Sequence, residues 1–182
     1  MSGTQRVSSM VVTVSPYDGR VSESNPATDR SRTPSVTSDD AAPGLAADRP
    51  VIKVTGVVLR RANGDVLTVR KRNTGMFMFP GGKPEVGETP LDTAIREVEE
   101  ELGLKLAPED LVPVGEWMTD AANEPGHGLH SHVFRGLTLL TKAPVPAREI
   151  AELRWQPVNG VEDVEDLAPL ARWYAIPAVR EL

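Results

Sequence analysis

The stretch that decides the fold covers residues 81–104 and reads GGKPEVGETPLDTAIREVEEELGL. A helix is predicted after the two opening glycines, because Thr89 is a good N-cap residue and Pro90 suits the first helical position. Gly103 is a typical residue at the end of a helix. Between these signals the apolar residues recur at helical spacing and form one stripe: Leu91, Ala94, Ile95, Val98 and Leu102. The stretch therefore predicts a glycine loop followed by an amphipathic helix that packs on a core.

Three acidic side chains lie together on the side of this helix away from the stripe: Glu97, Glu100 and Glu101. Like charges at positions i and i+4 destabilise a helix by about 0.2–0.5 kcal/mol per pair, and the negative helix end adds to this cost. A bound cation would remove the cost, and carboxylate oxygens suit Mg²⁺ or Mn²⁺. For the glutamates taken alone, a solvated acidic face is the alternative explanation.

The residues around the cluster favour a metal site that binds phosphate. The glycines let the backbone approach a ligand closely, and Lys83 offers a positive charge for a phosphate group. Arg96 can reach Glu100 one turn later and orient the acids. Glu88 precedes the helix, where it can accept hydrogen bonds from Arg96 or from the first amides of the helix.

This arrangement resembles the Nudix box, with no departure at any fixed position. The matching residues are Gly82, Glu88, Arg96, Glu97, Val98, Glu100, Glu101, Gly103 and Leu104. The flanks, among them Phe79-Pro80 and the later Trp155, extend the resemblance from Val51 to the C-terminus. The resemblance implies an α/β fold, an α/β/α sandwich around a mixed β-sheet. It also implies a hydrolase that cleaves nucleoside diphosphates linked to another moiety and uses divalent cations.

The same resemblance assigns roles to the residues of the box. The metal ligands would be Glu97, Glu100, Glu101 and the carbonyl of Gly81, with Mg²⁺ as the cofactor and Mn²⁺ as its substitute. Arg96 and Glu88 would hold the loop and the helix in shape. Water would attack phosphorus, with Glu100 or Glu101 as the first choice of base and Glu149 as the second. A solvated charge at the edge of a strand is the alternative reading of Glu149.

Substrate contacts are expected from four residues: Lys83, Phe77, Glu124 and His130. The loop 120–128, rich in Gly, Asn and Pro, is expected to cover the substrate as a lid. The three histidines, His127, His130 and His132, are most simply surface or packing residues. A zinc site there would need a third ligand at a definite spacing, and none is evident in the sequence.

The substrate class stays open at this point. The Phe-Pro-Gly-Gly-Lys flank is similar to the MutT-like branch of the family, which clears modified nucleoside triphosphates. A hydrolase of ADP-ribose or another sugar nucleotide is a second reading. A non-catalytic ligand sensor is a third, although such modules usually lose box carboxylates and none is lost here. Fold and family do not determine substrate.

Length and composition set the wider limits. The chain has 182 residues, enough for one domain and a tail. In residues 1–48, Ser, Thr, Pro and Gly supply 21 positions, which predicts a disordered tail, and residues 49–182 would form the Nudix domain. A net charge of −6 argues against a nucleic-acid partner, and the lack of cysteine excludes thiol chemistry.

The expected partner is therefore a small-molecule nucleotide. No apolar run is long enough to span a membrane, so we expect no membrane association and a cytoplasmic location. Trp155 and Trp173 are interpreted as core or interface residues, and the second option corresponds to a homodimer.

Strands are predicted at 51–60, 66–72, 76–79, 112–118, 129–140 and 150–156, with a final helix within 164–174. The Asn63-Gly64 turn predicts that the first two strands pair as a hairpin. No regular element is expected for Gly81 to Pro84.

Overall fold

The predicted helix is present as α1 (Pro90–Leu102), with the expected signals at both ends. The computed structural model describes residues 49–147 and 149–180, and the expected tail, residues 1–48, lies outside the described residues. Thr89 accepts a hydrogen bond from the Asp92 amide, and Asp92 accepts one in return from the Thr89 amide, which makes a capping box. Gly103 ends the helix in the left-handed region at φ 66°, and its amide donates to the Glu99 carbonyl at 2.8 Å.

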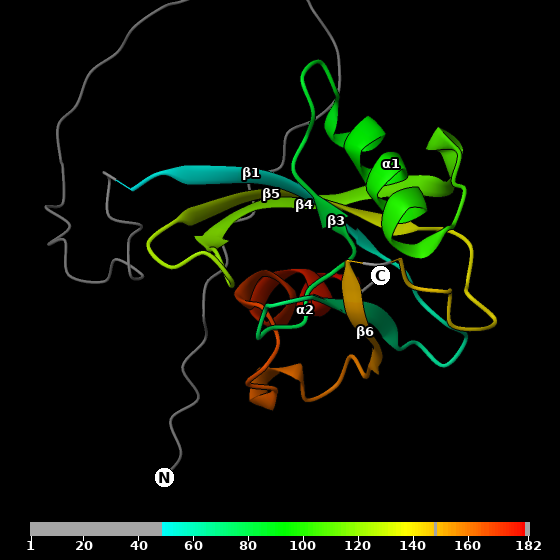
Figure 1. Ribbon diagram of the computed structural model, residues 1–182. Coiled ribbons are helices and arrows are strands. Elements are labelled where there is room, and N and C mark those ends of the chain that lie inside the picture. Colours follow the sequence, from blue (N-terminus) through cyan, green and yellow to red (C-terminus); the bar gives the residue numbers. More distant parts are fainter. Residues whose placement is uncertain (1–48, 148, 181–182) are drawn as a thin grey trace, which may run out of the picture. The chain divides into compact units, whose positions relative to one another are not determined.

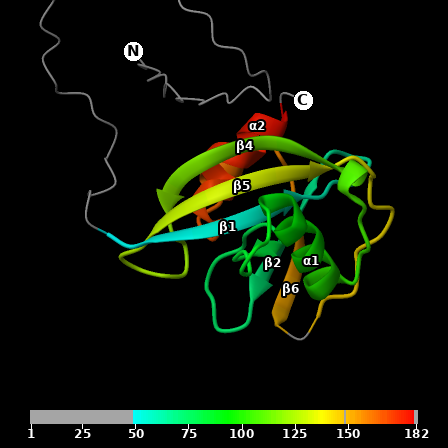
Figure 2. The ribbon, with the colours of Figure 1, turned by 90° about the horizontal axis from the view of Figure 1, so that it is seen from above.

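The helix packs on a four-stranded mixed sheet with the strand order β3-β1-β5-β4. β1 (Val51–Val58) runs parallel to β5 (Gly128–Gly136), whereas β3 (Gly81–Gly82) and β4 (Leu111–Asp120) run antiparallel to their neighbours. Figure 2 shows β4, β5 and β1 side by side. The two-residue strand β3 corrects the expectation that Gly81 and Gly82 belong to no regular element: they pair with Gly56 and Thr55 of β1.

A second sheet pairs β2 (Val66–Lys71) with β6 (Ile150–Gln156) in antiparallel orientation. The predicted hairpin between the first two strands is therefore wrong. Only one isolated bridge, between Arg60 and Val66, joins the segments on either side of the Asn63-Gly64 turn. Beyond it the chain enters the other sheet, where β2 has β6 as its partner.

Two other predicted elements differ from the structure. Residues 76–79 make isolated bridges, Met78 with Val69 and Phe77 with Leu167, but form no strand. The last helical segment begins inside the predicted range, with a π-helical stretch at Leu170–Ala175, but continues beyond it as α2 (Ile176–Arg180). Two short 3₁₀ turns complete the described elements, at Pro108–Asp110 and Val161–Asp163.

Two apolar clusters fill the space on the two faces of the four-stranded sheet, with α1 on one side and α2 on the other (Figure 1). The predicted helix stripe belongs to the first cluster, where Ala94, Val98 and Leu102 meet Val57 of β1. The second cluster joins the opposite face, represented by Val58 and Val133, to the C-terminal helical segment. The layers confirm the expected α/β/α sandwich around a mixed sheet. Within the described part of the chain, no helix has the length and apolar character needed to cross a membrane.

The stripe predicts the cost of a cavity under α1. Val98 is 0% exposed, so Val98→Ala should lower the free energy of unfolding by about 2 kcal/mol through lost apolar burial and incomplete collapse. Val86→Ala is the matched control, because Val86 is fully exposed in the loop before α1 and should change stability by less than about 0.5 kcal/mol. Urea unfolding measures both values. Equal losses in the two variants would contradict the packing described here.

Candidate functional site

The acidic side of α1 is divided by burial. Glu97 is 8% exposed and Glu101 is 0% exposed, whereas the Glu100 side chain is 58% exposed. This corrects the simple picture of three acids on one face away from the core. β3 covers the two buried acids, and the Gly81 amide donates to Glu101 Oε2 at 3.0 Å. The site therefore contains two carboxylates that are removed from water and one at the surface.

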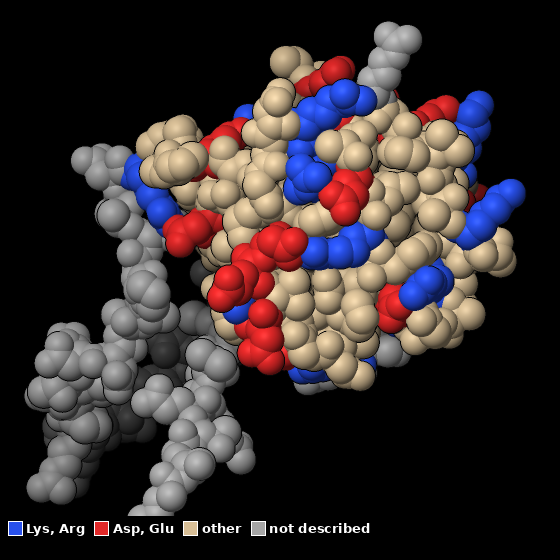
Figure 3. Space-filling view, turned by 60° about the horizontal axis from the view of Figure 1, so that its bottom comes forward, with Lys and Arg blue, Asp and Glu red and all other residues tan. Residues whose placement is uncertain are grey.

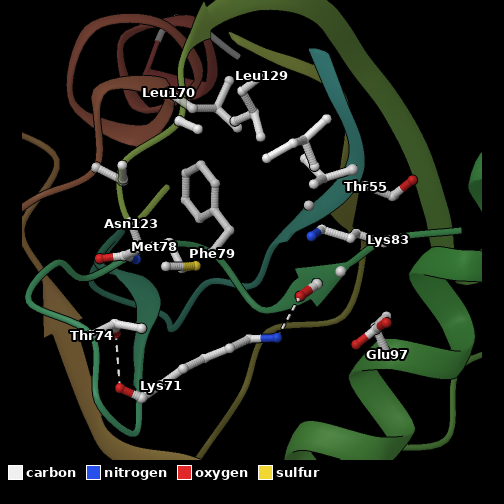
Figure 4. A pocket seen from close by; sticks show the side chains of 18 of the residues that line it. Thr55, Lys71, Thr74, Met78, Phe79, Lys83, Glu97, Asn123, Leu129 and Leu170 are labelled. Atoms are coloured by element: carbon white, nitrogen blue, oxygen red, sulfur yellow. Dashed lines mark hydrogen bonds between the residues drawn. The ribbon is translucent and has the colours of Figure 1, made fainter. Parts of the chain in front are cut away.

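Lys71, at the end of β2, reaches into this acidic site (Figure 4). Its Nζ lies 2.7 Å from Glu101 Oε1 and 3.8 Å from Glu149 Oε1, and it donates to the Gly81 carbonyl at 3.2 Å. The sequence reading missed this residue. The available signal was a lysine at the end of a buried, β-branched strand, but no local spacing indicates that this strand ends beside α1.

Burial decides the ionisation of the pair. Desolvation raises the pKa of Glu101 to about 7, although the Lys71 ammonium and the Gly81 amide both favour the carboxylate. Desolvation also opposes the charged form of Lys71, but the neighbouring Glu101 outweighs it and the pKa of Lys71 is raised. The charged carboxylate is thus costly in this position and depends on a cation beside it.

Arg96 holds the loop and the helix together, as the resemblance implies. Its Nε donates to Glu88 Oε1 at 2.7 Å, and its Nη1 contacts Glu97 Oε1 at 2.8 Å and Glu100 Oε2 at 3.1 Å. Its Nη2 donates to the Lys83 carbonyl at 3.1 Å. Hydrogen bonds from Arg96 and from the Glu85 amide lower the pKa of Glu88 to about 2. One guanidinium therefore orients three carboxylates and the turn before α1.

The oxygens beside Lys71 fit a divalent metal ion. Glu97, Glu101 and Glu149 each offer one carboxylate oxygen, and these oxygens lie within 4.8 Å of one another. The Gly81 carbonyl, which already accepts a hydrogen bond from the Lys71 ammonium, adds a fourth hard oxygen. Gly82 keeps the space open, since a Cβ there would lie 2.2 Å from Glu97 Oε1. Sequence reasoning assigned Glu149 a role as base, whereas the structure brings it among the possible ligands.

A cavity of about 510 Å³ opens beside these oxygens. This volume is within the usual range for small-molecule sites. Its apolar wall comes from β1, β5, the segment before β3 and the C-terminal helical segment: Ile52, Val54, Met78, Phe79, Leu129 and Leu170. Its polar rim comes from α1 and three loops: Lys83, Glu97, Glu100, Asn123, Glu124 and Glu149. Lys83 Nζ and Glu124 Oε1 lie 3.1 Å apart on this rim, so two predicted substrate residues are brought together.

The other two predicted substrate residues lie elsewhere. Phe77 is 4% exposed in the core, and the Arg154 guanidinium carbon lies 3.7 Å from its ring centroid. His130 points to the face of the sheet that carries α1, where it bonds Glu116. Met78 and Phe79 line the cavity in place of Phe77. The error arises because Phe77 and Phe79 lie in one extended segment, and aromatic character alone does not tell which of the two rings meets the ligand.

The comparisons with known proteins agree with this geometry. The family model of the NUDIX domain matches residues 51–176. A "MutT-like protein" of Streptomyces ambofaciens is 27% identical over 130 residues, which are 71% of this chain and 67% of that protein. An "RNA pyrophosphohydrolase" of Halorhodospira halophila is 37% identical over 60 residues, 33% of this chain and 32% of that protein. The chain thus spans two thirds of the first relative and about a third of the second.

Solved structures show the same fold. The MutT protein of Methanosarcina mazei Go1 superposes with a TM-score of 0.60 at 23% identity, over 75% of this chain and 98% of that one. A Nudix hydrolase of M. smegmatis gives a TM-score of 0.51 at 26% identity, over 71% and 84%. Together with the complete box and the family match over more than half of the sequence, these findings show that the chain belongs to the Nudix hydrolase family.

Proposed function

We propose that the chain is a pyrophosphohydrolase that cleaves the diphosphate linkage of a nucleoside diphosphate derivative by attack of water at phosphorus. Nucleoside triphosphates are the first candidates. The proposal rests on one observation: hard oxygens of α1, β3 and Glu149 surround the Lys71 ammonium beside a cavity with an apolar wall. The names of the relatives support it, since one is a MutT-like protein and another an RNA pyrophosphohydrolase.

The residues divide into ligands and a base. Glu97, Glu101, the Gly81 carbonyl and Glu149 would hold Mg²⁺, or Mn²⁺ in its place. A bound ion of this kind lowers the pKa of coordinated water and neutralises charge on phosphoryl oxygens. Glu101 is fully buried and both its oxygens are engaged, so it suits a ligand better than a base.

Glu100 is the better choice of base. Its side chain is exposed on the rim of the cavity, and Arg96 Nη1 fixes one of its oxygens at 3.1 Å. A carboxylate in this position can take the proton of the attacking water while the guanidinium keeps it oriented. Arg96 thereby acts as a positioning residue for Glu97 and Glu100, through bonds that also fix Glu88.

The two lysines would act on phosphate groups. Lys83 stands on the rim of the cavity, where Glu124 holds its ammonium until an anion replaces the carboxylate. Lys71 now lies where the oxygens converge, so a divalent ion would displace its ammonium toward the cavity, which Lys71 also lines. Both groups are point charges on flexible stems, which suits a substrate with several phosphates.

The apolar wall favours a nucleobase as the other end of the substrate. Phe79 and Met78 line the cavity (Figure 4), and an aromatic ring and a thioether both make favourable contacts with a flat base. Hydrolysis of ADP-ribose or another sugar nucleotide, and ligand sensing without catalysis, are the alternatives that the same cavity would allow.

We infer a mononucleotide rather than a nucleic acid as the substrate. On the face shown in Figure 3, acidic and basic side chains lie in separate small groups between uncharged residues, and the described residues form no broad basic area there. The net charge of −6 points the same way. A cytoplasmic location and a homodimer remain part of the proposal, and Trp173, at 51% exposure, is the aromatic side chain that such a contact would use.

The direct test is hydrolysis of a panel of substrates with Mg²⁺: nucleoside triphosphates, sugar nucleotides, dinucleoside polyphosphates and RNA with a 5′-triphosphate. Wild type should release product from at least one of them, and Glu101→Gln should reduce kcat by at least about 100-fold, because charge stabilisation at phosphorus is lost. Glu99→Gln is the matched control on the same helix, since Glu99 is exposed and contacts only the exposed Lys105 at 3.7 Å among the ion pairs described. Its rate should stay within about twofold of wild type. Turnover that survives EDTA, or no turnover on the whole panel, would refute the proposal.

The raised pKa of Glu101 predicts a pH dependence of stability in EDTA. A carboxyl group with a pKa near 7 when folded and 4.5 when unfolded binds more protons in the folded state between these values. The contribution of this carboxyl group to the free energy of unfolding is therefore complete below pH 4.5 and is lost as pH rises to 7. The loss is up to about 3 kcal/mol, at 1.36 kcal/mol per pKa unit. Glu101→Gln lacks this titration. Urea unfolding from pH 5 to 8 should show wild type losing stability relative to the variant, and parallel curves would contradict the assignment.

Gly82→Ala tests the space between β3 and α1. Its Cβ would meet Glu97 Oε1 at 2.2 Å, so the carboxylate must move and the rate should fall by at least about tenfold. Gly75→Ala is the control, because a Cβ there meets nothing within 4 Å. Hydrolysis rates per folded molecule, with folding checked by circular dichroism, compare the two. Equal rates for both variants would show that Glu97 does not need its present position.

A further inference from the structure

A second cluster of metal-ligating side chains lies on β4 and β5: Glu116, His130 and His132. Glu116 is paired in register with His132 across the two antiparallel strands, and His130 is two residues from His132 on the same face. His130 Nε2 bonds Glu116 Oε1, and His132 Nδ1 lies 3.6 Å from Glu116 Oε2. One ligand atom of each residue lies within 4.8 Å of those of the other two.

This cluster is separate from the hydrolytic site. Leu129 lines the cavity and Val133 joins the apolar cluster on the same side of β5, so the alternating residues His130 and His132 face the other side. β1 lies between β5 and β3 in the sheet, so a full strand separates the histidines from the glycines at the carboxylate site. None of the three side chains has a role in the hydrolysis proposed above.

We propose that Glu116, His130 and His132 form a binding site for a borderline divalent transition-metal ion, with Zn²⁺ as the ion it fits best. Two imidazole nitrogens and one carboxylate oxygen are ligands that Zn²⁺ accepts at about 2.0–2.2 Å. Tetrahedral geometry at these bond lengths places ligand atoms about 3.3 Å apart, and the three ligand atoms here lie within 4.8 Å of one another, so small side-chain movements suffice. The hard ion Mg²⁺ prefers oxygen ligands and would not compete.

The surroundings leave room for an ion and its remaining ligands. The side chains of His130, His132 and Glu116 are 25%, 36% and 42% exposed, so water or a second molecule can complete the coordination. Lys53 of β1 is in register with His130, so the strand pairing places its positive charge beside the proposed cation. Lys53 is exposed, and its long stem lets the ammonium remain in water.

The site has a structural consequence for the loop over the cavity. β4 ends at Asp120 and β5 begins at Gly128, and the loop between them carries Asn123 and Glu124 on the cavity rim. A metal ion held by Glu116 and the two histidines joins the strands at the base of this loop. Binding there therefore stabilises the folded β4–β5 pair, and the free energy of unfolding rises with the concentration of the ion.

The composition of the chain makes the test specific. The chain contains three histidines and no cysteine, so imidazole ligands come only from His127, His130 and His132. Zn²⁺ binding is measured by calorimetry and by the melting temperature in excess Mg²⁺, in the Glu101→Gln background that weakens the carboxylate site. We expect one Zn²⁺ per chain and a raised melting temperature. Co²⁺ in place of Zn²⁺ should give the visible absorption of nitrogen–oxygen coordination.

Ligand variants and a matched control decide the outcome. His130→Ala, His132→Ala and Glu116→Gln should each weaken Zn²⁺ binding by at least about tenfold, the lower end of the loss that even an outer-shell partner causes. His127→Ala is the control, because His127 contacts the Pro125 carbonyl in the loop and lies outside the cluster. Lys53→Met should leave binding unchanged or tighten it, since a positive charge is removed.

The opposite results overturn the proposal. If the ligand variants and His127→Ala bind Zn²⁺ equally, or if the Glu101→Gln background shows no Zn²⁺-dependent rise in melting temperature, the cluster is an ion pair between Glu116 and the histidines and no metal site. Loss of hydrolysis in these experiments is not a criterion. Failure of the zinc site thus remains distinct from failure of the proposed hydrolase function.

Discussion

The contact on which the site depends is the one between Lys71 Nζ, Glu101 and the Gly81 carbonyl. It joins β2 of the small sheet to α1 and to β3 of the large sheet, so one ammonium group connects a helix with strands of both sheets. A fully buried carboxylate is costly to ionise, and burial, with a smaller contribution from the nearby Glu97, raises the pKa of Glu101. The ammonium group of Lys71 stabilises the ionised form of the buried Glu101. A divalent cation could take its place beside the same carboxylate and carbonyl oxygens.

This arrangement explains why α1 carries acids where a helix gains least from them. Glu97, Glu100 and Glu101 lie in the last turns, near the negative end of the helix dipole, and no basic residue occupies the last turn. Arg96 supplies one positive charge, which contacts Glu88, Glu97 and Glu100. Lys71 supplies another from outside the helix, beside Glu101. The helix α1 is thus less stable than it would be with neutral or basic residues in its last turns. Such a loss of stability is common where a functional site needs several negatively charged groups close together.

The sequence predicted well what depends on neighbours along the chain. The N-cap at Thr89, the stop at Gly103 and the apolar stripe of α1 are all encoded by residues close together in the sequence. Strand β6 was also expected at the bounds that the structure shows, 150–156. Strand partners were a different matter, because the Asn63-Gly64 turn is compatible with a hairpin and nothing local indicates that β2 pairs with a strand about 80 residues later.

The missed site residues have the same origin. Lys71 of β2 meets Glu101 of α1, and Glu116 of β4 meets His130 of β5, only because the tertiary fold brings separate elements together. The third ligand that the histidines lacked in the sequence lies 14 residues earlier on β4, at a distance along the chain that no ligand-spacing rule covers. Phe77 was predicted as a substrate contact, whereas Phe79 lines the cavity, because only tertiary packing shows which ring of this segment meets it.

The register of β1 with β5 connects the two faces of the large sheet. In this parallel pairing Ile52 lies opposite Leu129 and Lys53 opposite His130, so cavity-facing and opposite-facing residues alternate along this part of both strands. A shift of one residue would turn Leu129 away from the cavity and move the histidines into it. The buried residues of the two apolar clusters, Val57 on one face and Val58 on the other, oppose such a shift because each would lose its packing. The same apolar pattern that makes the sheet stable therefore keeps the apolar wall of the cavity on one face and the imidazole ligands on the other, which is the face that also carries α1.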